Sequence, residues 1–194
     1  DAQVQVRDSA GTTRNAPLFY VSPTQINFQI PAGSSAGAAT ISVLLNGSTV
    51  GQGTATIASV APGLFTANAT GKGVPAAVIL RVKADGTQTY ESLAQYDQTQ
   101  SAYVATPIDL GASTDQVFLI GYGTGIRNRS ALTAVGATIG GTAAVVSYAG
   151  ASSGFVGLDQ VNILIPRSLA SRGSVDVVLG VDSSTANTVT INLK

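Results

Sequence analysis

The residue types that most often carry enzyme chemistry are missing from this chain. None of its 194 residues is His or Cys, which removes the commonest general base, the commonest metal ligand and the usual partner of a nucleophilic Ser. Two segments, Gly33–Gly37 (GSSAG) and Gly150–Gly154 (GASSG), match the G-x-S-x-G pattern of a nucleophile elbow. That elbow needs a helix after the Ser and a base beside it, so we interpret both segments as Gly/Ser turns.

The carboxylate residues form no catalytic or metal-binding pattern. Glu91 is the single Glu and the Asp residues are scattered, whereas a glycosidase needs two carboxylates that face each other across a cleft. Calcium usually takes several oxygen ligands that are close in sequence. Asp109 and Asp115 come nearest to that pattern, but Asp in a turn is the ordinary interpretation. We therefore predict a protein that is not an enzyme, with no catalytic residue, metal site or cofactor.

A glycine-rich segment, Gly121–Gly125 (GYGTG), follows a predicted strand and invites comparison with phosphate-binding loops. It matches neither G-x-G-x-x-G nor the Walker loop with its Lys and Ser or Thr. Glycines within a strand more commonly let it bend or switch between sheets. We interpret the segment as structural.

A repeated amide pair is the first of two candidate binding features. Gln25 and Asn27 recur later as Gln160 and Asn162, and residues two apart in a strand share one face of the sheet. Both copies must solve the same folding problem but need not share a ligand. We therefore interpret the pairs as structural, with their amides satisfying loop backbone at one end of a sandwich, rather than as a binding site.

The second candidate feature is a group of aromatic residues between the repeated segments. The chain has no Trp, and Tyr90, Tyr96 and Tyr103 cluster outside the predicted core strands. Aromatic faces can pack against the apolar faces of a sugar. The three residues are a candidate contact patch for polysaccharide or protein, with packing of this segment onto a sheet as the alternative.

Composition narrows the range of partners. Charged residues make up 10% of the chain and ten acidic residues balance ten basic ones, so the chain lacks the basic patch on which nucleic-acid binding depends. No apolar run approaches the 18 residues of a membrane span. The absence of Cys is compatible with export into an oxidising space. These features favour a secreted or cell-surface protein that binds no nucleic acid and does not span a membrane.

Short runs with period-two or β-branched patterning dominate the chain, and turn signals such as Asn46-Gly47 separate them. Such a pattern is typical of a β-sandwich. Only Glu91–Gln100 could hold a turn or two of helix, with a loop as the alternative. We predict strands near the following residues: Gln3–Arg7, Leu18–Val21, Gln25–Ile30, Ala39–Leu45, Gly53–Val60, Ala76–Lys83, Gln116–Tyr122, Ala134–Ile139, Ala143–Tyr148, Gln160–Ile165, Ser174–Val181 and Thr188–Leu193.

The chain contains two copies of one sequence unit. Tyr20–Pro31 (YVSPTQINFQIP) aligns with Phe155–Pro166 (FVGLDQVNILIP), and the match continues after one gap. The first copy has no counterpart of Gln116–Thr133, which indicates that it lacks its opening strand. We predict an all-β chain of two tandem immunoglobulin-like β-sandwiches. A truncated one covers residues 1–62, and a second covers residues 63–194 with an insert around residues 75–115.

A sandwich that lacks a strand leaves an unpaired edge and an uncovered strip of core. The missing strand could have been cut off with the rest of a longer protein, or the insert could fold back and supply it. A neighbouring molecule could also donate it. We predict that the open edge lies near the start of the chain, at Val4 and Val6.

Several motifs together resemble a known protein family. They are APLFYVSPTQINFQIP, APGLFT, PIDLG, VFLIGYGTGIR and GLDQVNILIP, and the resemblance covers the chain from about Val4 to Leu193. In this set the chain resembles an uncharacterised domain at the C-termini of large secreted proteins, chiefly of acidobacteria. Its second copy also resembles immunoglobulin-like domains of the IPT/TIG type. The resemblance implies an extracellular, β-rich, non-catalytic module and carries over no catalytic residue or ligand.

The function expected from the sequence is that of a non-catalytic structural or adhesion module at the bacterial cell surface. Its partner would be another protein or a second copy of the chain. The most specific version of this hypothesis is self-assembly into fibres by strand donation. A neutral chain offers little electrostatic repulsion against such association. The alternative is a carbohydrate-binding accessory module of a larger secreted protein, which predicts exposed and roughly coplanar Tyr rings.

Overall fold

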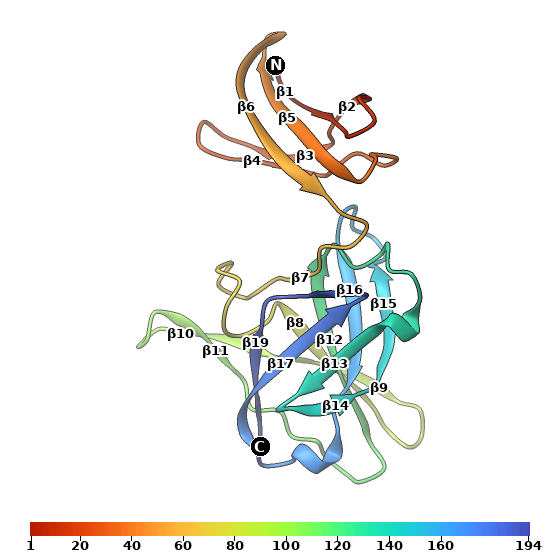
Figure 1. The fold of residues 1–194 in the computed structure, drawn as a ribbon. Helices are drawn as coiled ribbons and strands as arrows, with labels where there is room; N and C mark the ends of the chain where they lie inside the picture. The colour runs from red at the N-terminus through yellow and green to blue at the C-terminus, as the bar shows by residue number, and fades with distance from the viewer. The chain divides into compact units, whose positions relative to one another are not determined.

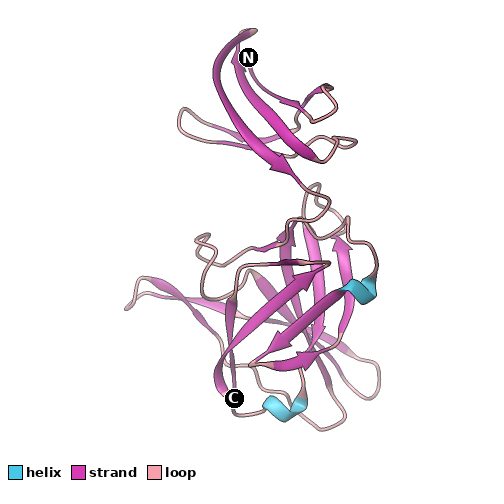
Figure 2. Ribbon diagram, viewed as in Figure 1, coloured by secondary structure: helices cyan, strands magenta, loops and turns pink.

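The computed structural model describes all residues from Asp1 to Lys194 and consists of antiparallel β-sheets (Figures 1 and 2). The prediction of an all-β chain is confirmed. Its helical segments are two three-residue 3-10 turns, η1 (Leu132–Ala134) and η2 (Arg167–Leu169). No helix is long and apolar enough to cross a membrane. The chain divides into two compact units, Asp1–Ser59 and Val60–Lys194.

The N-terminal unit contains a four-stranded sheet and a separate hairpin. The sheet has the order β2-β1-β5-β6, and the hairpin pairs β3 with β4 (Figure 1). The strands are β1 (Ala2–Arg7), β2 (Thr13–Asn15), β3 (Leu18–Val21), β4 (Ile26–Phe28), β5 (Gly37–Leu45) and β6 (Ser48–Ile57).

The core of the N-terminal unit is small. Its buried apolar residues are four: Val4, Val6, Ala16 and Ala39. Six larger side chains pack against them but are only partly buried, namely Leu18, Ile26, Phe28, Ile41, Val43 and Ile57. A unit of this size therefore buries little apolar surface from which to gain stability.

The C-terminal unit is a β-sandwich of two larger sheets. One sheet has the order β15-β16-β12-β8-β9, with β7 paired to β12, and the other has the order β14-β13-β17-β18, with β19 paired to β17. The first sheet contains β7 (Gly63–Leu64), β8 (Ala77–Val82), β9 (Gln88–Ser92), β12 (Gln116–Thr124), β15 (Val146–Ala151) and β16 (Asp159–Leu164). The second contains β13 (Val135–Ile139), β14 (Thr142–Ala144), β17 (Gly173–Val181), β18 (Ser184–Thr185) and β19 (Val189–Leu193). Apolar residues of both sheets form one continuous core.

The insert predicted around residues 75–115 belongs to the C-terminal unit. It supplies β8 and β9 to the first sheet and forms a separate hairpin of β10 (Ala94–Asp97) and β11 (Ala102–Ala105). The suggestion that this segment folds back to complete the first sandwich is therefore wrong. The helix considered for Glu91–Gln100 is also wrong, because pairing of β9 with β8 and of β10 with β11 overrides the local preference.

The two copies have matching strand neighbours. In the first copy β5 lies between β1 and β6, and in the second β17 lies between β13 and β19. Likewise, β4 pairs with β3 as β16 pairs with β15. The sequence repeat therefore corresponds to a structural repeat, and each position in one copy can be compared with its counterpart in the other. The immunoglobulin-like assignment itself stays a prediction.

Candidate functional site

The central Ser residues of the two G-x-S-x-G segments, Ser35 and Ser152, lie in loops and are not followed by a helix. Ser35 donates its backbone N–H to the carboxylate of Asp8 (3.0 Å), and Ser152 donates its backbone N–H to the carbonyl of Leu158 (2.8 Å). The Ser152 hydroxyl approaches only the amide oxygen of Gln160 (3.4 Å). Neither hydroxyl has a basic partner that could activate it as a nucleophile.

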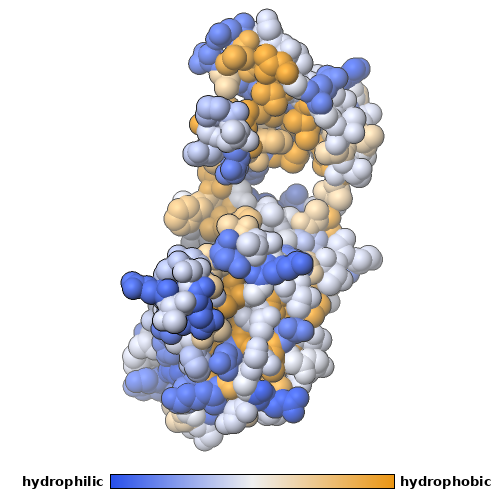
Figure 3. Space-filling view, turned by 90° about the vertical axis from the view of Figure 1, so that its left-hand side faces the viewer, coloured by the Kyte–Doolittle hydropathy of each residue, from blue (hydrophilic) through white to orange (hydrophobic).

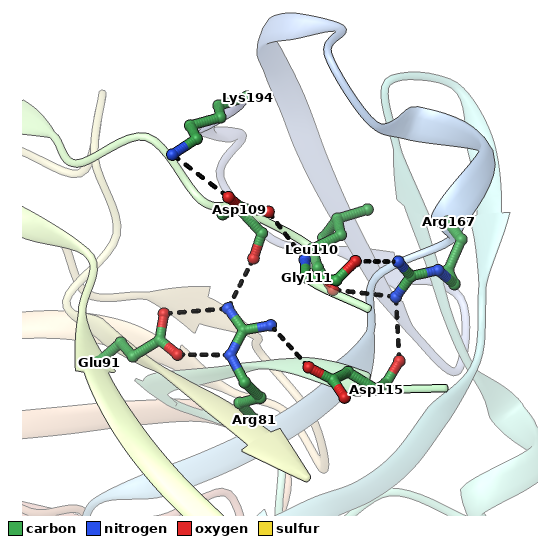
Figure 4. Close-up of polar contacts among 8 residues, drawn as sticks. All are labelled: Arg81, Glu91, Asp109, Leu110, Gly111, Asp115, Arg167 and Lys194. Carbon is green, nitrogen blue, oxygen red and sulfur yellow. Dashed lines mark hydrogen bonds and ion pairs between the residues drawn. The ribbon is translucent and has the colours of Figure 1, made fainter. Parts of the chain in front are cut away.

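A buried arginine, Arg81 on β8, organises a network of polar contacts in the C-terminal unit (Figure 4). Its Nε lies 2.7 Å and its Nη2 3.2 Å from the two carboxylate oxygens of Glu91, a bidentate pair. The same guanidinium donates to the Asp109 carbonyl (2.6 Å) and lies 3.5 Å from Asp115. The hydrogen bond that Arg81 donates to Glu91, and then the Asp115 carboxylate, raise the pKa of Arg81. The guanidinium thus links β8 to its neighbour β9 and to the loop before β12.

A second guanidinium holds the same loop from the other side. Arg167, in η2, donates to the carbonyls of Leu110 (2.9 Å), Asp115 (3.0 Å) and Gly111 (2.7 Å). The carboxylate of Asp109 accepts the Gly111 N–H (2.8 Å) and lies 3.2 Å from Lys194 Nζ. These two contacts lower the pKa of Asp109. Protein donors therefore occupy both carboxylate oxygens of Asp109, and the Arg81 guanidinium lies 3.5 Å from one oxygen of Asp115.

The candidate tyrosine patch is only partly assembled. Tyr96 on β10 and Tyr103 on β11 stand opposite each other, with ring centroids 5.4 Å apart and an interplanar angle of 75°. Tyr90 lies on β9 opposite Leu80 and therefore belongs to a different sheet. All three side chains are exposed. The edge-to-face geometry does not form the coplanar platform that the carbohydrate alternative predicts.

The repeated amide pairs bond within themselves. Gln25 Nε2 donates to Asn27 Oδ1 (2.7 Å), and Gln160 Nε2 donates to Asn162 Oδ1 (2.8 Å). The expectation that these side chains satisfy loop backbone is corrected, because each pair instead forms a short amide ladder along its strand. The same ladder in both copies fits a structural role.

Asp8 is a buried carboxylate that organises one end of the N-terminal unit. It accepts the backbone N–H groups of Ala10 (3.1 Å), Thr12 (3.0 Å) and Ser35 (3.0 Å), and it lies 2.6 Å from Arg14 Nη1. The Ser35 N–H, followed by Arg14, lowers the pKa of Asp8. Several donors therefore favour the ionised form of this side chain.

Asp8 makes the N-terminal unit sensitive to acid. Its pKa is lower in the folded than in the unfolded chain, so its stabilising effect is complete above about pH 4 and is lost as pH falls through the folded pKa. We expect Asp8→Asn to destabilise the unit at pH 7 and to flatten the fall in stability below pH 4. Urea unfolding at pH 2 to 7, followed by hydrogen exchange of β1 and β5 amides, measures this effect. An equally steep acid limb in both proteins would contradict the prediction.

The open edge of the N-terminal unit lies at β4. In the C-terminal unit, β16 pairs with β15 on one side and with β12 on the other. Its counterpart β4 pairs with β3 alone. At the end of this edge, the Ile165 N–H donates to the Val117 carbonyl (2.9 Å), whereas the N–H of the equivalent Ile30 has no acceptor in the chain. Residues 1–59 therefore contain no strand that corresponds to β12.

Two apolar side chains of the N-terminal unit are exposed where their counterparts in the second copy are buried. Ile30 is 39% exposed and Leu45 is 49% exposed, whereas their counterparts Ile165 and Val181 are 2% and 0% exposed. Figure 3 shows a broad hydrophobic area on the N-terminal unit. An apolar surface of this kind on a small unit is typical of a site that a protein partner covers.

Two glycines on β6 leave space on the inner face of the sheet. Gly51 and Gly53 on β6 lie opposite Val43 and Ile41, and Gly53 occupies the position that Val189 fills in the second copy. A Cβ at either glycine would meet no atom within 4 Å. The inner face of β5 and β6 therefore has room for side chains brought by an added strand. The open side is defined here as the β4 edge, Ile30, Leu45 and this inner face.

The sequence-based position of the open edge is wrong. Val4 and Val6 are 1% and 0% exposed, and they lie on β1, which is paired with β2 on one side and β5 on the other. They form the core of the unit and not its edge. The signal that would have located the edge is the gap in the repeat, but using it requires knowing that β12 and β16 are neighbours.

No protein-family model, curated protein or solved structure matched the chain in the comparisons made with it.

Proposed function

We propose that the chain is a non-catalytic, extracellular structural module of the bacterial cell surface that assembles with other copies of itself by strand donation. An extended segment of a neighbouring copy pairs with the free edge of β4 and covers the inner face of β5 and β6. The observation that carries this proposal is the contrast between the exposed Ile30 and its buried counterpart Ile165. The second copy thus supplies an internal example of the completed form.

The energetics favour such completion. Finishing the burial of a half-exposed Ile or Leu contributes about 1 kcal/mol, and the added strand also satisfies main-chain donors such as the Ile30 N–H. A chain with a net charge of zero opposes association only weakly. The absence of Cys and the resemblance to domains of secreted acidobacterial proteins support the extracellular setting.

The alternative function, a carbohydrate-binding accessory module, has one supporting observation. Tyr96 and Tyr103 are paired and exposed on the β10–β11 hairpin. Their rings meet edge to face, so they offer a sugar no shared flat surface. This candidate is therefore less well supported than assembly, and retention of the chain on immobilised polysaccharide would favour it.

A charge on the open side tests the proposal. We expect the purified chain to form regular filaments in electron micrographs and oligomers in mass photometry. Ile30→Lys places a charge on the free edge and is expected to raise the protein concentration needed for assembly by about 100-fold. Leu132→Lys is the matched control, because Leu132 is similarly exposed (37%) but lies in η1 of the other unit. This control is expected to assemble normally.

A peptide supplies the missing strand directly. The segment Gln116–Thr124 (QVFLIGYGT), which forms β12, is expected to occupy the open side and to prevent filament growth. A scrambled peptide is expected to have no effect. A monodisperse 19.4 kDa monomer that ignores the peptide would contradict strand donation.

A further inference from the structure

The N-terminal unit has a second free edge, on β6. This strand covers ten residues, Ser48–Ile57, and pairs only with β5. Every residue from Ser48 to Thr56 is exposed. None of the ten is charged and none is Pro. Natural proteins usually protect a long edge with charges, Pro or a covering segment. The strand β6 carries neither a charge nor a Pro.

In the second copy the equivalent edge is covered by other segments of the chain. Its counterpart is divided into two strands, β18 with two residues and β19 with five. The backbone of Gly73 and Ile108 bonds along its outer side, through Thr190 N–H to Gly73 O (2.8 Å) and Ile108 N–H to Asn192 O (2.8 Å). The N–H of Lys194 returns to Ile108 O (2.9 Å). The β6 edge has no such cover along its length.

We propose that β6 is an assembly edge that pairs antiparallel with β6 of a second copy about a two-fold axis. The two four-stranded sheets then form one continuous sheet across the pair of chains. This contact is separate from strand donation at β4 and does not rest on it. Donation links a donor to an acceptor and propagates, whereas the β6 contact joins identical surfaces and closes on itself.

A second copy fits this edge because the strand is compatible with itself. With no charge along β6, antiparallel self-pairing places no like charges opposite each other. Gln52 and Thr54 lie on one face, where cross-strand amide and hydroxyl contacts are favourable. Gly51 and Gly53 lie on the other face and present no side chain there. Each copy also brings the same unsatisfied row of N–H and C=O groups, so one contact satisfies both edges.

A lysine on the edge provides the test. Gln52→Lys is expected to weaken dimerisation of the full chain at least tenfold in sedimentation equilibrium, because it brings a charge onto each of the two pairing strands. Gln3→Lys is the matched control, because Gln3 is exposed on β1, which is not an edge strand. This control is expected to dimerise as the original chain does. Circular dichroism and the thermal midpoint establish that both variants are folded.

Hydrogen exchange and a second variant separate this proposal from strand donation. Amides of β6 are expected to become protected as protein concentration rises, and not to do so in Gln52→Lys. Ile30→Lys, which blocks the β4 edge, is expected to lose filaments but to keep the dimer. A chain that does not dimerise, or a Gln52→Lys chain that dimerises unchanged, would overturn pairing through β6. Filaments that persist in Gln52→Lys would leave strand donation standing on its own evidence.

Discussion

Replacing Arg81 by Met is expected to lower the free energy of unfolding of the C-terminal unit by about 3 kcal/mol or more. The guanidinium bonds the Glu91 carboxylate, the Asp109 carbonyl and the Asp115 carboxylate at once. Met fills a similar volume but leaves these oxygens without their donor, and unpaired polar groups in a partly buried place are costly. The loop before β12 would then lose one of the two guanidinium groups that bond to it and would keep the other, that of Arg167.

Two further variants separate the geometry of Arg81 from its charge. Arg81→Lys keeps the charge but cannot reproduce the bidentate contact with Glu91, so we expect an intermediate loss. Arg172→Met is the control, because Arg172 is exposed and forms no ion pair in the structure; its effect is expected to stay within about 0.5 kcal/mol. Urea unfolding with amide exchange of β8 and β9 as the local readout measures all three. Equal stability of Arg81→Met and Arg172→Met would show that the network contributes nothing.

The incomplete first copy could be anticipated from sequence because it depends on a repeat. Matching Tyr20–Pro31 with Phe155–Pro166 identifies the strand that has no counterpart, and no pairing needs to be known for that step. The side on which the sandwich is open could not be anticipated in the same way. Val4 and Val6 lie near the start of the sequence, but β1 is enclosed by a hairpin with β2 and by long-range pairing with β5.

The Arg81 network could not be predicted from the sequence, for a different reason. Its members come from β8, β9 and the loop before β12, and only the folded sheet brings them together. The residues around Glu91 are compatible with a short helix in isolation. In the structure Glu91 instead lies on β9, opposite Ile79 on β8. Local preference is weak information about a strand whose partner is decided by tertiary structure.

The glycines of Gly121–Gly125 are expected to be indispensable for a packing reason. A Cβ at Gly123 would lie 2.2 Å from the Gly63 carbonyl oxygen, and one at Gly125 would lie 2.0 Å from that of Ala61. Gly125 also has a positive φ of 72°. We expect Gly125→Ala to lower the free energy of unfolding of the C-terminal unit by roughly 3 kcal/mol, because backbone strain and overlap with a carbonyl act together.

The contacting backbone explains why neither atom can move away cheaply. The Ala61 N–H donates to the Gly125 carbonyl (3.0 Å), and β7 pairs with the end of β12 through Gly63 and Leu64. An added methyl group must therefore break this pairing or distort β12. The space beside Gly123 and Gly125, where a phosphate-binding loop would hold its ligand, is filled by the backbone of Ala61 and Gly63. This arrangement adds close backbone approach to the bending that was expected of these glycines.

Gly136→Ala is the control that isolates the close approach. Gly136 lies on β13, where a Cβ would meet no atom within 4 Å. Alanine there is expected to leave stability unchanged or raise it by up to about 1 kcal/mol, because it lowers the entropy of the unfolded chain. Thermal and urea unfolding compare the two variants, and added phosphate is expected to protect neither. If Gly125→Ala were as stable as Gly136→Ala, β7 would be dispensable for the C-terminal unit and the space beside Gly125 would be open to a ligand after all.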